Sequence, residues 1–236
     1  MNITEYHNYM INLLIDYSNG KEIKLSKEQP QEYNLLPLIL LFNRKVQKKY
    51  KVKLKVNEQL LAQYNKNLNK YLSKIPKQIQ KQFFKEIQKI NRLLNISNKS
   101  IRNTQLRLYR QNLKDKGIVK IPEKTSTGKT RYWKVDTYVD RAILNNQYNY
   151  VRDELLSDNQ EDVYRVVHLV DELSRPLCLP YNMTLITYGY PKIYRGELVQ
   201  NINETSYGQP AGLFGVNCRH FPIPVTNLED ISLYDY

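Results

Sequence analysis

A chain of 236 residues with a net charge of +13 can hold one large domain or two small ones and can bury a hydrophobic core. Its 2 cysteines are too few for a disulfide framework, and we expect them to remain thiols in a reducing compartment. Residues 1–16 lack a signal-peptide pattern, and the longest apolar run, Leu35 to Phe42, is far shorter than a membrane span of roughly 20 residues, so we expect a protein made in the cytoplasm without a membrane partner.

The charge divides sharply along the chain. Residues 1–135 carry 29 Lys and Arg against 9 Asp and Glu, whereas residues 136–236 carry 7 against 14. The densest stretch, Arg44 to Arg92, has 15 basic residues, opposed only by Glu58 and Glu86. A division this large indicates two regions with different surroundings.

The first 117 residues have the periodicity of helices. Four segments have apolar residues at helical spacing after a plausible start: residues 37–51, 57–72, 76–94 and 97–113. Gly117 stands where a left-handed residue commonly ends a helix. We therefore predict an elongated, basic helical arm over residues 1–117.

The pattern becomes mixed after Gly117. Short strand-like runs at 118–121 and 132–135 flank a loop, a further helix is predicted from Asp136 or Thr137 to Leu155, and residues 163–170 are typical of a buried strand. Gly and Pro then recur among short, irregular strands. The predicted fold class is α+β, with an elongated N-terminal helical region, a small compact α+β domain over residues 118–225 and an acidic C-terminal tail over residues 226–236.

The most specific motif in the chain runs from Tyr207 to Pro224. It reads Tyr-Gly-Gln-Pro-Ala-Gly-Leu-Phe-Gly-Val-Asn-Cys-Arg-His-Phe-Pro-Ile-Pro. This motif resembles the signature of phage minor capsid proteins, in which a Tyr-Gly turn precedes Gly-Leu-x-Gly-x-Asn-Cys-Arg-His and a proline. Weaker blocks at 101–118, 131–142 and 166–176 follow the family's order. After Arg175 the chain departs from the usual His, Trp and Gly, and its Cys178 is similar to the turn of the Mu-type head-morphogenesis group.

The resemblance implies a structural component of the virion and not an enzyme. It implies a minor capsid protein of head morphogenesis, in low copy inside the capsid near the portal, which occupies the host cytoplasm during assembly. Its partners would be the portal protein and other head proteins. Two alternatives stay open: a stand-alone basic helical nucleic-acid-binding protein, and an enzyme carried on a head-protein domain, for which the roughly dozen residues after the motif leave little room.

We expect the signature residues to fasten the final strand to the core. The structural motif consists of Arg175, Cys178, Gly208, Gly212, Gly215, Asn217, Cys218, Arg219 and His220. Its glycines permit turns with positive φ, and Asn217 can satisfy backbone groups of its own turn. Arg219 can pair through its guanidinium with a carboxylate such as Asp171 or Glu172.

The cysteines leave a second interpretation open. Cys178, Cys218 and His220, with His168 as a further candidate, could bind zinc, because thiolate and imidazole are zinc ligands. Against this, the Cys-x-His spacing is not the usual Cys-x-x-Cys pair, and a buried cysteine usually packs as a small hydrophobic residue. We therefore expect reduced, metal-free cysteines that matter for folding, and no cofactor.

Four lysines form the candidate binding surface of the arm. Lys77, Lys81, Lys85 and Lys89 follow i, i+4 spacing, which places them on one stripe of a helix. Such a stripe can neutralise phosphates of double-stranded DNA or face an acidic protein surface such as the portal. The alternative is a solvated helical face.

Aromatic residues are interleaved with lysines in the same stretch, which would suit nucleic-acid bases as well as a helical core. They are Tyr50, Tyr64, Tyr71, Phe83 and Phe84.

No catalytic motif is complete. Residues 127–130 end like a phosphate-binding loop, but Glu123 stands where its first glycine should be. Cys218 and His220 lack a defined orienting acid. His7 lies in a polar terminus without a functional signal, and Glu154 is interpreted as part of a solvated helix end.

Overall fold

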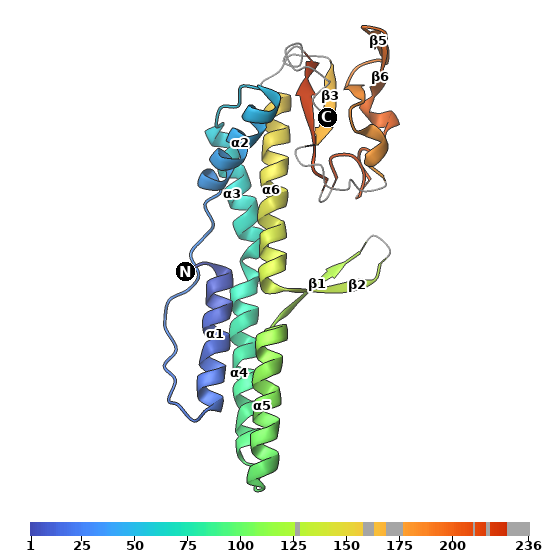
Figure 1. Cartoon of the computed structure of the whole chain (residues 1–236). Coiled ribbons are helices and arrows are strands. Elements are labelled where there is room, and N and C mark those ends of the chain that lie inside the picture. The colour runs from blue at the N-terminus through green and yellow to red at the C-terminus, as the bar shows by residue number, and fades with distance from the viewer. Residues whose placement is uncertain (126–127, 158–162, 169–176, 210, 216–217, 226–236) are drawn as a thin grey trace. The chain divides into compact units, whose positions relative to one another are not determined.

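The computed structural model in Figure 1 describes residues 1–125, 128–157, 163–168, 177–209, 211–215 and 218–225. Helices dominate its first half and short strands its second, which confirms the predicted α+β class. The elements are α1 Ile3–Ser18, α2 Leu36–Tyr50, α3 Glu58–Leu72, α4 Lys74–Leu94, α5 Lys99–Lys116, β1 Lys120–Lys124, β2 Thr130–Lys134, α6 Val135–Ser157, β3 Tyr164–His168, η1 Leu179–Tyr181, β4 Leu185–Thr187, β5 Lys192–Tyr194, β6 Glu197–Asn201, η2 Ile202–Glu204 and β7 His220–Pro224.

Most predicted helix ends lie close to the local signals that indicated them. The Asn57 side chain accepts a hydrogen bond from Leu60 N at 3.1 Å before α3, and Asn98 accepts one from Ile101 N at 3.1 Å before α5. Gly117 ends α5 with a φ of 67°. Helix α4 begins at Lys74, ahead of the predicted start, because its proline is tolerated in the first turn.

Helix α1 was not predicted from the sequence. Its start is a capping box, in which Glu5 N donates to Asn2 Oδ1 at 2.9 Å and Asn2 N donates to Glu5 Oε2 at 2.7 Å. Tyr6, Met10 and Leu14 repeat at i, i+4 spacing and are buried. The signal was therefore present in residues that we had taken as a polar terminus.

The chain folds into two compact units, each assembled from two stretches of sequence. Unit 1 comprises Met1–Tyr33 and Asn67–Ala142, and unit 2 comprises Asn34–Lys66 and Ile143–Tyr236. Helices α3 and α6 contribute residues to both units. The predicted boundary at residue 117 coincides with the end of α5 and stays a prediction about domain organisation.

Unit 1 is built on α1, α4 and α5, which lie side by side (Figure 1). Ile79 and Phe83 of α4 are fully buried, and Leu106 of α5 is buried as well. Tyrosine hydroxyls join the helices at their margins: Tyr17 donates to Asn91 Oδ1 at 2.7 Å, and Tyr109 donates to Glu86 Oε2 at 2.7 Å. The antiparallel β1–β2 hairpin completes the unit where two short strands were predicted.

His7 is part of the core of unit 1. It is 5% exposed, and its Nε2 accepts a hydrogen bond from Ile118 N at 3.3 Å. A Cβ at Gly117 would lie 2.7 Å from the His7 ring, so glycine serves there both for its positive φ and for the close approach. Burial lowers the pKa of His7 to about 4, although the charge of Asp136 acts in the opposite direction. The prediction that His7 lies in a polar terminus was wrong.

Unit 2 contains a five-stranded sheet in the order β5-β6-β4-β3-β7. The β4–β6 pair is parallel and the other pairs are antiparallel. Every residue of β7 is buried. Phe42 of α2 and Tyr148 of α6 pack on Phe221 of β7, with ring centroids 5.9 and 5.1 Å away. Among the helices in the described ranges, none is both long and apolar enough to cross a membrane.

The burial of His7 predicts a specific pH dependence of stability. In the unfolded chain His7 has its ordinary pKa of about 6.5, whereas in the folded chain its pKa is about 4. The contribution of the neutral, buried His7 to the free energy of unfolding is therefore complete above about pH 6.5 and is lost as the pH falls toward 4. Replacing His7→Gln keeps an acceptor but removes the titration. Urea unfolding near pH 7 and pH 4.5 should show wild type losing about 2 kcal/mol more than the variant. Equal losses would contradict the burial of a neutral His7.

Candidate functional site

Both cysteines lie in the core of unit 2 as free thiols. Cys178 directly precedes η1, Cys218 lies just before β7, and each is 2% exposed. They pack with Tyr164 and Val166 of β3 and with Leu213. Two segments that are distant in the sequence therefore meet against strand β3.

The structure brings Cys178, Cys218 and His220 together. The two sulfur atoms and a ring nitrogen of His220 all lie within 4.8 Å of one another, and all three residues are buried. Cys218 Sγ is 3.4 Å from His220 Nδ1. His168 pairs with His220 across β3 and β7, and their ring centroids are 4.9 Å apart.

His220 is fully buried, and its surroundings favour the neutral imidazole. Burial, the largest cause, and the charges of the neighbouring His168 and Arg152 together lower the pKa of His220 to about 4. A neutral ring keeps a nitrogen lone pair, which can accept a hydrogen bond or bind a metal ion.

A buried arginine, which the sequence analysis missed, holds the segment that leads into β7. Arg152 of α6 donates from Nε to His220 O at 2.9 Å, from Nη1 to Phe214 O at 3.2 Å and from Nη2 to Cys218 O. Its Nη1 also donates to Asn149 Oδ1 at 2.7 Å. Burial lowers the pKa of Arg152, but a guanidinium remains charged in proteins. One side chain therefore positions the carbonyls around the cluster.

The signature glycines serve different purposes. Gly208 has a φ of 82°, as predicted. The prediction of a positive φ was wrong for Gly212. Glycine is required there because there is no room for a side chain: a Cβ would lie 1.8 Å from Ser206 O. Gly215 belongs to successive turns, since its N–H donates to Gly212 O at 3.0 Å and its carbonyl accepts from Cys218 N at 3.0 Å.

Several predicted contacts lie outside the described residues. Arg175 and Asn217 are among these, as are both carboxylates that were considered as partners of Arg219, together with residues 226–236. Arg219 itself is half-buried.

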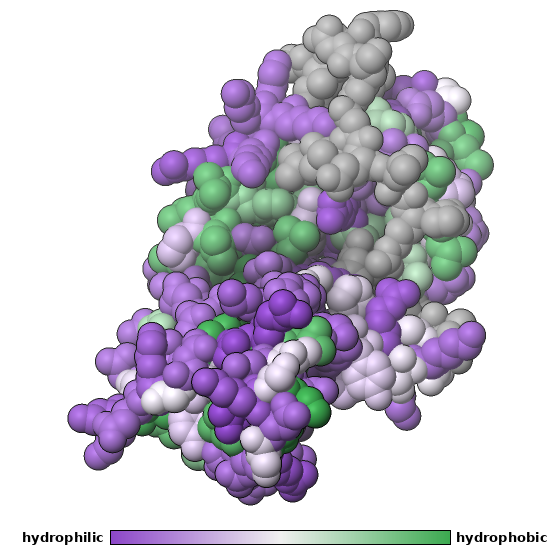
Figure 2. Space-filling model, turned by 60° about the horizontal axis from the view of Figure 1, so that its bottom comes forward, coloured by the Kyte–Doolittle hydropathy of each residue, from purple (hydrophilic) through white to green (hydrophobic). Residues whose placement is uncertain are grey.

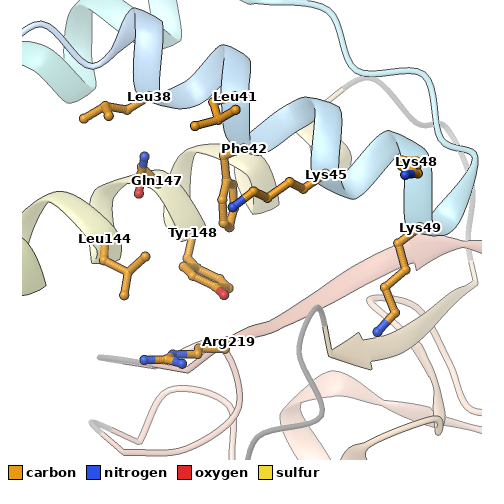
Figure 3. A pocket seen from close by; sticks show the side chains of 10 residues that line it. All are labelled: Leu38, Leu41, Phe42, Lys45, Lys48, Lys49, Leu144, Gln147, Tyr148 and Arg219. Carbon is orange, nitrogen blue, oxygen red and sulfur yellow. The ribbon is translucent and has the colours of Figure 1, made fainter.

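Arg219 lines a groove of about 660 Å³ in unit 2. Figure 3 shows apolar side chains of α2 and α6 on opposite sides of this space, including Leu41 from α2 and Leu144 and Tyr148 from α6. Its cationic lining residues are Lys45, Lys48, Lys49 and Arg219. Within the described part of the chain, no acidic side chain lines the groove.

The predicted lysine stripe is exposed along α4 of unit 1. It consists of Lys77, Lys81, Lys85 and Lys89. Lys89 differs from the others, since its Nζ lies 3.7 Å from Glu86 Oε2 and 5.0 Å from the centre of the Tyr109 ring. The surface in Figure 2 is largely hydrophilic where the helical end of the molecule comes forward.

In the described part of the signature motif, Gly212, Leu213, Cys218 and His220 are buried within unit 2. The family model of Phage minor capsid protein 2 matches residues 27–231, and the chain belongs to this family. The match extends well before the four blocks that carried the resemblance and includes α2. No curated protein and no solved structure matches the chain.

The close approach at Gly212 predicts a large cost for one added methyl group. In Gly212→Ala the new Cβ would collide with a backbone carbonyl, and Ser206 cannot move freely because its hydroxyl donates to Leu177 O at 2.6 Å and accepts from Leu213 N at 2.9 Å. The free energy of unfolding should fall by more than about 2 kcal/mol. Gly189→Ala is the control, because its Cβ would meet only Thr187 Oγ1 at 3.5 Å. Similar stability of the two variants in urea would contradict this packing.

Proposed function

We propose that this protein is a low-copy, non-enzymatic component of the phage head that lies inside the capsid beside the portal and contacts packaged DNA. Membership of the minor capsid family supports a role in the virion over a stand-alone nucleic-acid-binding protein. The exposed lysine stripe of α4 is the observation that carries the DNA contact.

The distribution of charge between the units supports this assignment. Unit 1 has 22 Lys and Arg against 10 Asp and Glu, whereas unit 2 has 14 against 13. Folding therefore pairs the basic residues 34–66 with the acidic end of the chain and leaves the positive excess in unit 1. An excess of this kind attracts the phosphate backbone without selecting a sequence.

The interleaved aromatic residues favour backbone contact over base stacking. Tyr50 and Phe83 are buried, and the Tyr64 hydroxyl donates to Asp153 Oδ2 at 2.5 Å. Tyr71 and Phe84 are about half exposed, at 52% and 49%, but the Tyr71 ring stacks on that of Tyr138. Since most of these rings serve the fold, the partner that fits best is duplex DNA, in which the bases are already stacked.

The groove of unit 2 is assigned to a protein partner, namely an acidic segment of the portal protein. Leu41 is 55% exposed beside the groove, so apolar surface is available there. Lys45 and Lys48 of α2 supply positive charge next to that apolar surface. An amphipathic segment with alternating apolar and acidic residues complements both features.

The stripe is tested by a salt titration of the full chain on one labelled duplex. A fragment that ends near residue 120 would cut through both units, so the comparison uses full-length variants. The test variant changes Lys77, Lys81, Lys85 and Lys89 to Glu. Wild type should bind without sequence preference, and the variant should lose most of its affinity at low salt. The slope of log binding constant against log salt concentration should also become shallower, by about 0.9 for each lost phosphate contact.

The matched control for the stripe changes four other exposed lysines of unit 1 to Glu, namely Lys24, Lys27, Lys124 and Lys129. It alters net charge equally and should retain most of the binding. If both variants lost the same affinity for the duplex, binding would depend on net charge alone and the lysine stripe would not be the DNA-binding surface. Failure of wild type to bind at low salt would remove DNA from the set of partners.

The location is tested by quantitative mass spectrometry of purified virions. The protein should be present at a copy number far below that of the major capsid protein. Leu41→Glu should reduce its amount in particles severalfold, because the new charge repels an acidic partner. Leu40→Glu is the control, since Leu40 is 42% exposed on the same helix but does not line the groove.

Two outcomes of that measurement would contradict the proposal. Absence from particles despite abundance in infected-cell lysate would exclude a virion component. Equal incorporation of the Leu40 and Leu41 variants would exclude the groove as the docking surface.

A further inference from the structure

We propose that Cys178, Cys218 and His220 bind one structural zinc ion in the core of unit 2. From spacing alone, we expected metal-free cysteines. The convergence of three potential ligand atoms from two distant segments changes that expectation. The chemistry also fits, since thiolate sulfur and imidazole nitrogen are the preferred ligands of structural zinc.

The geometry of the cluster is close to that of a zinc site. Zinc–sulfur and zinc–nitrogen bonds of about 2.3 and 2.0–2.1 Å at a tetrahedral angle place sulfur and nitrogen about 3.6 Å apart. Cys218 Sγ and His220 Nδ1 are 3.4 Å apart, which matches one edge of such a tetrahedron. All the ligand atoms lie within 4.8 Å of one another, so adjustments of about 1 Å complete the triangle.

The charge of the bound site suits its surroundings. Zinc binding deprotonates both thiols, and two thiolates neutralise the divalent ion. The site would therefore bring no net charge into a core that contains Val166, Ile186 and Leu213. A divalent ion without thiolates could not be accommodated there.

Simpler explanations account for only part of the cluster. A thiol–imidazole hydrogen bond would explain the approach of Cys218 to His220, and hydrophobic packing would explain the burial of either cysteine. Hydrophobic packing places both cysteines in one cluster, but it does not require two sulfur atoms and a ring nitrogen to converge within 4.8 Å of one another. A closed zinc site has a fourth ligand. His168 on the neighbouring strand is a candidate, because its ring centroid lies 4.9 Å from that of His220, but it is not part of the three-residue cluster, so its ring would have to turn to complete the site.

The proposed ion would tie the turn before η1 to the start of β7. In such sites the free energy of metal binding contributes directly to folding. Arg152 already fixes the carbonyls of Cys218 and His220, so these two ligands are preorganised and Cys178 closes the site.

The test measures metal in the full chain purified without chelators from zinc-supplemented cultures. Wild type should contain about one zinc per chain, and Cys178→Ser and Cys218→Ser should each contain less than about a tenth of that. His7→Gln is the control, because it alters a buried histidine in unit 1 and should keep full zinc content. Cobalt(II) added to the zinc-depleted wild type should produce a thiolate-to-metal charge-transfer band that neither serine variant shows.

If a serine variant fails to fold, the melting temperature of the wild-type protein with and without zinc still tests the proposal. A strong chelator should lower its melting temperature, and zinc should restore it while magnesium does not. Metal-free wild type that shows no cobalt band and no response of its melting temperature to zinc would overturn the proposal. The cysteines would then be packing residues of the core.

Discussion

The arrangement of unit 2 depends on one buried guanidinium. Backbone carbonyl groups at and just before the start of β7 need hydrogen-bond donors where they are buried. Arg152 donates to three of those carbonyls from a single position on α6. A buried charge is costly unless it is fully hydrogen-bonded, and a buried carbonyl is costly without a donor. Each therefore offsets the cost of burying the other, and the signature motif is held in place as a result.

Features that depend on neighbouring residues were predictable. Asn57 and Asn98 cap their helices, and Gly117 ends α5, because capping is decided within a few residues of the chain. The buried strand β3 was indicated by its own apolar run. The signature from Tyr207 to Pro224 identified the family because its residue identities and spacing are specific.

Features that depend on distant partners were not predictable from patterns. Arg152 is the single basic residue between Arg141 and Arg165, but nothing nearby shows that the carbonyls it satisfies come from the other end of the chain. His7 became a core residue only because α1 packs beside α5, and Glu154, interpreted as solvated, is 4% exposed. The convergence of Cys178 with Cys218 and His220 has the same origin. The pairing of β3 with β7 positions His220, whereas Cys178 is positioned by the turn that leads into η1.

Each unit is assembled from two separated stretches of sequence, so the two units become complete at different times during synthesis. Unit 1 is complete once residue 142 has left the ribosome, whereas unit 2 must wait for strands near the end of the chain. At about 5–20 residues per second, the roughly 180 residues between Phe42 and Phe221 take about 10–35 s to synthesise, and α2 lacks the sheet that covers Phe42 for that time. During that interval an apolar, strongly basic helix is open to chaperones and to other nascent chains. Contacts between segments so distant in sequence also slow folding, because a long loop must close before they form.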